Sequence, residues 1–163
     1  MSIGAVRAAF LSAAMMGVLV FGVAPSAAQA GQRIAASTIP SAQLIQPAEL
    51  NKLLKGAAST RPLVLQVGFQ MMYTEAHIAG SEYAGPGATP EGLQALRGRV
   101  KSLPRNRFIV IYCGCCPWSH CPNIGAAYKE LRDMGFTRVK ALYLADNFGT
   151  DWVNQGYAVA RGE

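Results

Sequence analysis

Short apolar runs alternate with longer segments of helical periodicity, and this alternation limits the chain to a small set of folds. The clearest apolar runs are Pro62–Val67, Phe108–Tyr112 and Val139–Leu144. They are too short for buried helices and they lack regular polar alternation, which is typical of strands buried on both faces of a parallel sheet. The sequence therefore predicts an α/β fold, with a small, mainly parallel β-sheet flanked by helices.

The segments between these runs predict the flanking helices. Proline at the first turn and a glycine just beyond the last turn are the usual boundary signals. On that basis helices are expected to begin near Pro47, Thr89, Ile124 and Phe148, and the third to end before Gly135. We see no internal repeat and no low-complexity tract.

The N-terminal segment has the pattern of a targeting sequence. Arg7 is its single charge, an apolar run covers residues 8–24, and Ala28-Gln29-Ala30 ends it with small residues at cleavage spacing. This pattern predicts a secretory signal peptide over residues 1–30, a linker over 31–44 and one domain over 45–160. The expected location is periplasmic or secreted. An uncleaved segment would be the alternative, and it would be the only membrane contact.

Charge adds little to the functional interpretation. The formal net charge is +6 at pH 7, and an exported protein of this size is not expected to bind nucleic acid. Five basic residues lie close together in sequence, and we interpret them as a solvated helix surface rather than an anion site. They are Arg97, Arg99, Lys101, Arg105 and Arg107.

All four cysteines lie within nine residues, from Cys113 to Cys121. Cys113 directly follows the strongest predicted strand, and a helix is expected about ten residues later. Ligands of open α/β sheets bind at the carboxyl ends of the strands, and the N-terminus of a helix favours negative charge. We therefore expect Cys113 to have a lowered pKa and to act as a nucleophile.

The chain resembles the rhodanese-like (sulfurtransferase) domain family over about residues 45–160. The resemblance is carried by ordered pieces of sequence, each weak alone: Leu63–Val67, Tyr73, His77–Ser81, Ile109–Cys113, Ala126-Ala127, Leu131, Gly135-Phe136, Val139, Gly149, Trp152 and Gly156-Tyr157. The resemblance implies that Cys113 carries a persulfide, taken from a sulfur donor and passed to an acceptor.

Three departures from the family pattern affect the expected activity. Gln66 stands where an acidic residue is usual, and Gly68 where a basic one is usual. The loop is also longer than usual, it contains no Arg or Lys, and only His120 in it could carry positive charge. An anion such as thiosulfate needs a cationic partner to leave water. Ordinary thiosulfate sulfurtransferase and phosphatase activities are therefore disfavoured.

The leading hypothesis is sulfur transfer or thiol redox chemistry, which would make the protein a sulfurtransferase or a thiol oxidoreductase. Cys113, Cys116 and Cys121 are the predicted catalytic residues, with the latter two as resolving thiols. The predicted substrate-binding loop contains Gly114, Cys115, Trp118, Ser119 and His120. The expected partner is a small sulfur donor or a protein with a reactive thiol.

The alternative hypothesis is a soft-metal module without turnover. Cys113, Cys115, Cys116 and Cys121 would supply the ligands, and copper(I) fits their spacing better than zinc does. No cofactor is required by the sequence. A third hypothesis is a partner-binding domain whose loop is closed by disulfides, for which four cysteines allow three pairings.

Overall fold

The computed structural model describes Met1 and residues 35–162. The predicted signal peptide, residues 1–30, lies outside the described residues. In the part that is described, no helix is both long and apolar enough to cross a membrane. The segment predicted as a linker contributes to the domain where it is described, because Ala36 and Ile39 are buried in the core and a short strand begins at Leu44.

Five strands form the central sheet in the order β1-β6-β5-β2-β4, and every neighbouring pair is parallel. The strands are β1 (Leu44–Ile45), β2 (Leu63–Gln66), β4 (Glu82–Tyr83), β5 (Ile109–Tyr112) and β6 (Val139–Leu142). The predicted parallel α/β sheet is confirmed. The three strands expected from the apolar runs form its centre, and the two unpredicted strands, each of two residues, form its edges.

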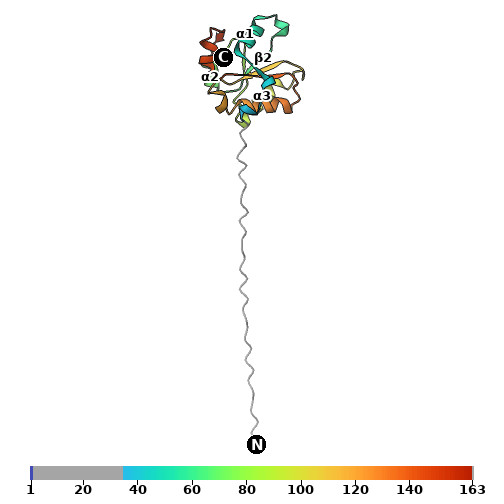
Figure 1. Ribbon diagram of the computed structural model, residues 1–163. Coiled ribbons are helices and arrows are strands. Elements are labelled where there is room, and N and C mark those ends of the chain that lie inside the picture. The colour runs from blue at the N-terminus through green and yellow to red at the C-terminus, as the bar shows by residue number, and fades with distance from the viewer. Residues whose placement is uncertain (2–34, 163) are drawn as a thin grey trace. The chain divides into compact units, whose positions relative to one another are not determined.

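The helices cover both faces of the sheet. They are α1 (Pro47–Lys55), α2 (Gln70–Glu75), α3 (Pro90–Val100) and α4 (Ile124–Asp133). Figure 1 shows α1 and α3 on opposite sides of β2, consistent with their contributions to separate core clusters. The helix expected near Phe148 is a single π-helical turn, η5 (Gly149–Val153), and four short 3-10 turns complete the set: η1 (Ala36–Thr38), η2 (Ser41–Gln43), η3 (Ala58–Thr60) and η4 (Trp118–His120).

Strand pleating divides the core into two layers. Ile109, Ile111 and Cys113 pack in the layer that includes α3 and α4. Val110 and Tyr112 pack in the other layer, with Leu50 of α1 and Trp152 of η5. Successive residues of a strand point to opposite faces, so the end of β5 supplies side chains to both layers.

A separate antiparallel pair fixes the C-terminal segment. Strand β3 (His77–Ile78) pairs with β7 (Val159–Ala160), and His77 is aligned with Ala160. This pairing brings the last described residues next to α2, far from their place in the sequence.

Candidate functional site

The cysteine loop begins where β5 ends. Gln66 of β2 is aligned with Tyr112 of β5, so the loop after β2 lies beside Cys113. Gly114 has a φ of +77°, and a Cβ at that position would lie 2.7 Å from the Cβ of Phe148. Glycine therefore permits both the left-handed backbone and the close approach of the two chain segments.

Backbone hydrogen bonds hold the loop against the segment that follows β6. The amide of Phe148 donates to the carbonyl of Gly114 at 3.1 Å, and the amide of Trp118 donates to the carbonyl of Ala145 at 3.1 Å. Trp118 is half-buried and its ring lies 5.3 Å from that of Tyr143. These contacts position the cysteines on a supported loop.

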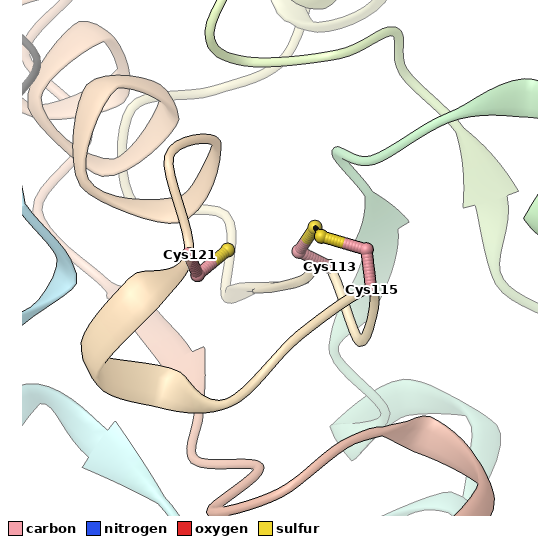
Figure 2. Close-up of side chains that lie close together, drawn as sticks. All are labelled: Cys113, Cys115 and Cys121. Atoms are coloured by element: carbon pink, nitrogen blue, oxygen red, sulfur yellow. Dashed lines mark hydrogen bonds between the residues drawn. The ribbon is translucent and has the colours of Figure 1, made fainter.

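The four thiols gather as the sequence predicts. The Sγ atoms of Cys113 and Cys115 are 3.1 Å apart, and those of Cys115 and Cys116 are 3.2 Å apart. The Sγ atoms of Cys113, Cys115 and Cys121 all lie within 4.8 Å of one another. Figure 2 shows the Cys121 sulfur pointing from the loop before α4 toward the other two. All four cysteines are free thiols.

Asn123 is a site residue that sequence reasoning missed. It is fully buried, and its Nδ2 atom donates to Cys113 Sγ at 3.3 Å and lies 4.0 Å from Cys115 Sγ. Its Oδ1 atom accepts the amide of Ala88 at 3.0 Å. An asparagine just before a helix normally caps it, but this side chain makes no capping bond to α4. It therefore gives the sulfurs a neutral donor in place of a cation.

The two family positions that depart from the usual pattern lie beside Cys113. The buried side chain of Gln66 accepts the amide of Gly68 at 3.1 Å through Oε1, and its Nε2 atom lies 3.5 Å from the carbonyl oxygen of Cys113. A Cβ at Gly68 would lie 3.0 Å from Cys113 Sγ. A larger residue at position 68 would therefore press on the sulfur.

In the structure the cysteine with a lowered pKa is Cys121, whereas the sequence predicted it to be Cys113. Contacts with the thiols of Cys113 and Cys115 lower the pKa of Cys121 to about 3, and backbone amides of Asn123 and Ile124 add to this effect against the opposing effect of burial. The amides at the start of α4 thus face Cys121. An anion at a helix N-terminus is favoured by such donors and by the helix dipole.

The prediction of a lowered pKa at Cys113 is therefore wrong. The contact with Cys115 lowers the pKa of Cys113, but its contact with Cys121 and its burial outweigh this and raise the pKa to about 12. The pKa of Cys115 is also raised, mainly by its contact with Cys113. Burial raises the pKa of Cys116. The cluster thus holds its first negative charge at Cys121.

Cys113 borders the larger open space. A cavity of about 450 Å³ is lined on one side by Cys113, Gly114 and Cys115. A much smaller void of about 10 Å³ lies among Cys113, Cys116, Cys121 and Trp118. Cys113 borders both, whereas Cys121 borders only the void. A small molecule entering the cavity therefore comes close to Cys113 and Cys115.

The predicted substrate-binding loop is brought together only in part. Gly114 and Cys115 line the large cavity, and Trp118 lines the small void. Ser119 and His120 are exposed, their side chains contact each other at 2.9 Å, and neither borders these two spaces.

Several residues outside the cysteine loop have structural contacts rather than contacts with the sulfurs. His77 is buried, stacks on Tyr73 with ring centroids 3.8 Å apart, and lies 2.8 Å from the carbonyl oxygen of Tyr73 through Nδ1. Trp152 is fully buried. Met71 lies on the outer side of the short helix α2 and is exposed.

The basic residues form surface interactions. Arg97 pairs with Glu130 at 3.0 Å, and Arg99 pairs with Glu82. Arg105 lies over the ring of Phe136, with its guanidinium carbon 4.6 Å from the ring centroid. These contacts agree with a helix surface and its flanks rather than an anion site.

Comparisons with known proteins identify the fold. No family model matches the sequence, and no curated protein matches it. Among solved structures, the BH2092 protein from Bacillus halodurans superposes with a TM-score of 0.56 and 23% identity, over 72% of this chain and 75% of that one. The rhodanese-like domain of the Alr3790 protein from Anabaena sp. gives a TM-score of 0.54 and 21% identity, over 73% of this chain and 79% of that one.

A third structure extends this likeness beyond bacteria. Ygr203w from Saccharomyces cerevisiae, described as a homolog of single-domain rhodanese and the Cdc25 phosphatase catalytic domain, gives a TM-score of 0.50 and 17% identity, over 74% of this chain and 88% of that one. These three superpositions establish the fold, and at identities of 17–23% they establish the fold alone. The chain is therefore a rhodanese-like domain by fold, and it carries a cluster of four cysteines on the loop that follows β5.

Proposed function

We propose that this domain performs sulfur transfer or thiol redox chemistry through Cys113, with Cys121 as the resolving thiol. The observation that carries the proposal is the position of Cys113, which lines the large cavity and whose sulfur lies within 4.8 Å of the Cys121 sulfur. A nucleophile must reach the substrate, and its partner must reach the intermediate. Cys113 meets the first condition and Cys121 the second.

The chemistry begins with a proton transfer inside the cluster. The thiolate of Cys121 takes the proton of the Cys113 thiol, which leaves a thiolate at Cys113. That thiolate attacks the outer sulfur of a persulfide donor, RS–SH, to form Cys113–S–SH and release RS⁻. The negative charge of the cluster thus moves to the sulfur that faces substrate, although it resides on Cys121 at rest.

The intermediate has two outcomes. An acceptor thiolate can take the outer sulfur and release the Cys113 thiolate. Alternatively, the Cys121 thiolate attacks Cys113 Sγ, which forms a Cys113–Cys121 disulfide and releases HS⁻. The two cysteines are then oxidised by two electrons and the released sulfur is reduced by two. Two molecules of an external thiol would restore the reduced cluster.

Cyanolysis tests the proposal directly. Purified protein is incubated with a persulfide donor, freed of it and treated with cyanide, which removes a persulfide sulfur as thiocyanate. Wild type should yield thiocyanate and Cys113→Ser should yield none. Cys121→Ser should load sulfur more slowly, because it lacks the proton acceptor, but it should keep the thiocyanate yield once loaded and lose sulfide release. Equal thiocyanate from wild type and Cys113→Ser would exclude sulfur transfer through Cys113.

A second candidate function is binding of a soft metal, with copper(I) as the favoured ion. It is supported by the mutual distances within 4.8 Å among the sulfurs of Cys113, Cys115 and Cys121. For comparison, sulfurs around a tetrahedral zinc ion with Zn–S of about 2.3 Å lie about 3.8 Å apart. Three thiolates in a buried setting suit copper(I), which needs fewer ligands than zinc.

Anaerobic titration with copper(I) against a competing chelator tests this candidate. Cys115→Ser should weaken binding more than Cys116→Ser, because Cys116 lies outside the group of three sulfurs. Weak binding that neither variant changes would exclude it. Mass spectrometry of the purified protein separates the candidates further by detecting persulfide, metal or disulfide.

Phosphatase activity is not favoured despite the likeness to a phosphatase homolog. The loop from Cys113 to Asn123 contains no Arg or Lys, and the side-chain nitrogen that donates to Cys113 Sγ belongs to the neutral amide of Asn123. A phosphoryl dianion needs cationic or multiple amide donors.

We further propose export through residues 1–30, which would place the thiols where disulfides persist. The test is to express the full sequence and a variant without residues 1–30 and to measure how much of each protein leaves the cytoplasm. Equal export of the two would overturn the proposal.

A further inference from the structure

The large cavity contains two opposite charges in addition to the thiols. Within the part of the chain that the structure describes, Glu75 is the one acidic residue lining it and Arg161 the one basic residue. Both are exposed at its margin. Nothing in the sequence connects either residue with Cys113, because the three come from different parts of the chain.

The fold holds Glu75 and Arg161 next to each other. Glu75 is the last residue of α2, and Arg161 follows β7 directly. Arg161 Nη1 donates to the main-chain carbonyl of Glu75 at 3.2 Å, and the amide of Gly162 donates to the carbonyl of Thr74 at 2.8 Å. The C-terminal segment is therefore fastened along α2, which keeps the guanidinium at the cavity.

The two charges do not neutralise each other. Among the described residues, the ion pairs within 4.0 Å involve other side chains, and the Arg161 guanidinium bonds to the Glu75 carbonyl rather than to its carboxylate. One guanidinium and one carboxylate are thus available to a ligand. An arginine can bind a carboxylate with two parallel hydrogen bonds, and a glutamate can accept from an ammonium group.

The remaining surface suits a small polar molecule with an apolar part. The amide side chains of Gln66 and Asn147 and the apolar side chains of Met72, Phe148 and Val153 complete much of the wall. The volume of about 450 Å³ lies within the range of about 300–1,000 Å³ for small-molecule sites. The thiols of Cys113 and Cys115 form the reactive part of this wall.

We infer that this cavity selects a zwitterionic amino-acid thiol, presented as its disulfide or persulfide. The ligand carboxylate binds Arg161, its ammonium binds Glu75, and its sulfur faces Cys113. This inference rests on the proposed function, because it uses Cys113 as the nucleophile. With a disulfide RS–SR, the Cys113 thiolate attacks one sulfur, forms Cys113–S–S–R and releases RS⁻, so no further oxidant is needed.

Three disulfides that differ only in charge test the inference. Cystine carries both charges on each half, cystamine lacks the carboxylates, and dithiodipropionate lacks the ammonium groups. The reduced protein is mixed anaerobically with each one, and the initial rate of thiol release is measured. We expect cystine to react fastest, because it alone satisfies both Glu75 and Arg161.

Two variants should divide this preference by charge. Arg161→Gln should slow the reactions of cystine and dithiodipropionate about tenfold, as loss of a charged hydrogen-bonding partner implies, and leave cystamine unchanged. Glu75→Gln should slow cystine and cystamine and leave dithiodipropionate unchanged. The controls Lys101→Gln and Glu91→Gln remove exposed charges at α3 and should change none of the three rates.

The outcomes separate the inference from the function on which it rests. If all three disulfides react at rates that neither variant alters, and Cys113→Ser abolishes them, the inference is overturned and the proposed function stands. If no disulfide reacts faster with wild type than with Cys113→Ser, both are overturned. Thermal melts of Glu75→Gln and Arg161→Gln matching wild type would exclude misfolding as the cause of a lower rate.

Discussion

Two polar clusters lie near the end of β5, one around Tyr112 and one around the next residue, Cys113, and they are built differently. The first joins Tyr112 to Ser81 and Ile78, with hydroxyl–hydroxyl and amide–hydroxyl distances of 3.0 and 3.1 Å. The second contains Cys113 and its neighbouring thiols. In the first, buried hydroxyls are matched with fixed partners, whereas in the second the sulfurs mainly contact one another and Asn123.

The clusters also differ in what surrounds them. The hydroxyl of Tyr112 has partners on two sides, and burial raises the pKa of Tyr112 above its usual value. Both Tyr112 and Cys113 line the cavity of about 450 Å³, but in the second cluster the pKa of Cys121 is lowered to about 3, which favours a thiolate there. A buried network with every partner supplied stabilises the fold. A group of nucleophiles beside open space is suited to reaction.

The largest expected effect is on activity at Cys113. Cys113→Ser should lower thiol release from cystine at least about 1,000-fold, as removal of a nucleophile does in other enzymes. Its free energy of unfolding should change by no more than about 1 kcal/mol, because serine is smaller than cysteine and the site borders a cavity. Kinetics and urea unfolding measured on the same samples check both halves. A stability loss as large as that caused by a cavity in the core would show that Cys113, like Tyr112, mainly stabilises the fold.

The neighbouring residue should give the opposite result. Tyr112→Phe leaves the buried amide of Ile78 without its partner, so it should lower the free energy of unfolding by about 1–3 kcal/mol. Thiol release should stay within about twofold of wild type, since the aromatic ring is kept. Urea unfolding and the cystine assay test this. An active-site role for the tyrosine hydroxyl would appear as a rate loss without a stability loss.

The next effect concerns pH and Cys121. The pKa of Cys121 is about 3 in the folded chain and near its ordinary value of 9.0 when unfolded, so between these values the unfolded chain binds one more proton. Stability should therefore rise with pH in this window and be lost as pH falls, by roughly 1 kcal/mol per pH unit. The raised pKa of Cys113 acts in the opposite sense, but only as pH rises above its ordinary value of 9.0 toward about 12.

Urea unfolding between pH 8 and pH 5 measures this dependence, and Cys121→Ser supplies the control. The variant lacks the titrating thiol, so its stability should vary less with pH than that of wild type. Identical pH profiles for the two proteins would show that Cys121 is not the thiolate of the cluster.

The smallest expected effect is at Ser81. Ser81→Ala removes one partner of the Tyr112 hydroxyl but leaves the bond from the amide of Ile78. The free energy of unfolding should fall by about 1 kcal/mol, and thiol release should not change. A larger activity loss than stability loss would mean that the two clusters are coupled across β5.

The sequence was sufficient for the central strands and for the cysteine cluster. Strands β2, β5 and β6 are continuous apolar runs, and a strand followed at once by Cys113 places that residue at the carboxyl end of a parallel sheet. The edge strands were missed because two residues have no periodicity to detect. Their pairing is imposed by the neighbours, β6 for β1 and β2 for β4.

Thiol acidity and the cavity were not accessible from the sequence. The loop length does not tell which cysteine receives the amides at the start of α4, and this decides the order of pKa values. Arg161 reaches the cavity through the antiparallel pair β3–β7, each strand only two residues long. The one signal for Asn123 was its place before a helix, which suggested capping rather than contact with sulfur.

Position 68 has no side chain, and this affects where a chemical group can be attached to the sulfur of Cys113. Because the backbone at position 68 lies so close to Cys113, a sulfur or thiol attached to Cys113 has more room on the side of the cavity. Alanine at that position would put a methyl group 3.0 Å from Cys113 Sγ and 2.9 Å from Gln66 Nε2. Gly68→Ala would thus crowd the sulfur of Cys113 while keeping all four cysteines, and it should slow the addition of any group to that sulfur.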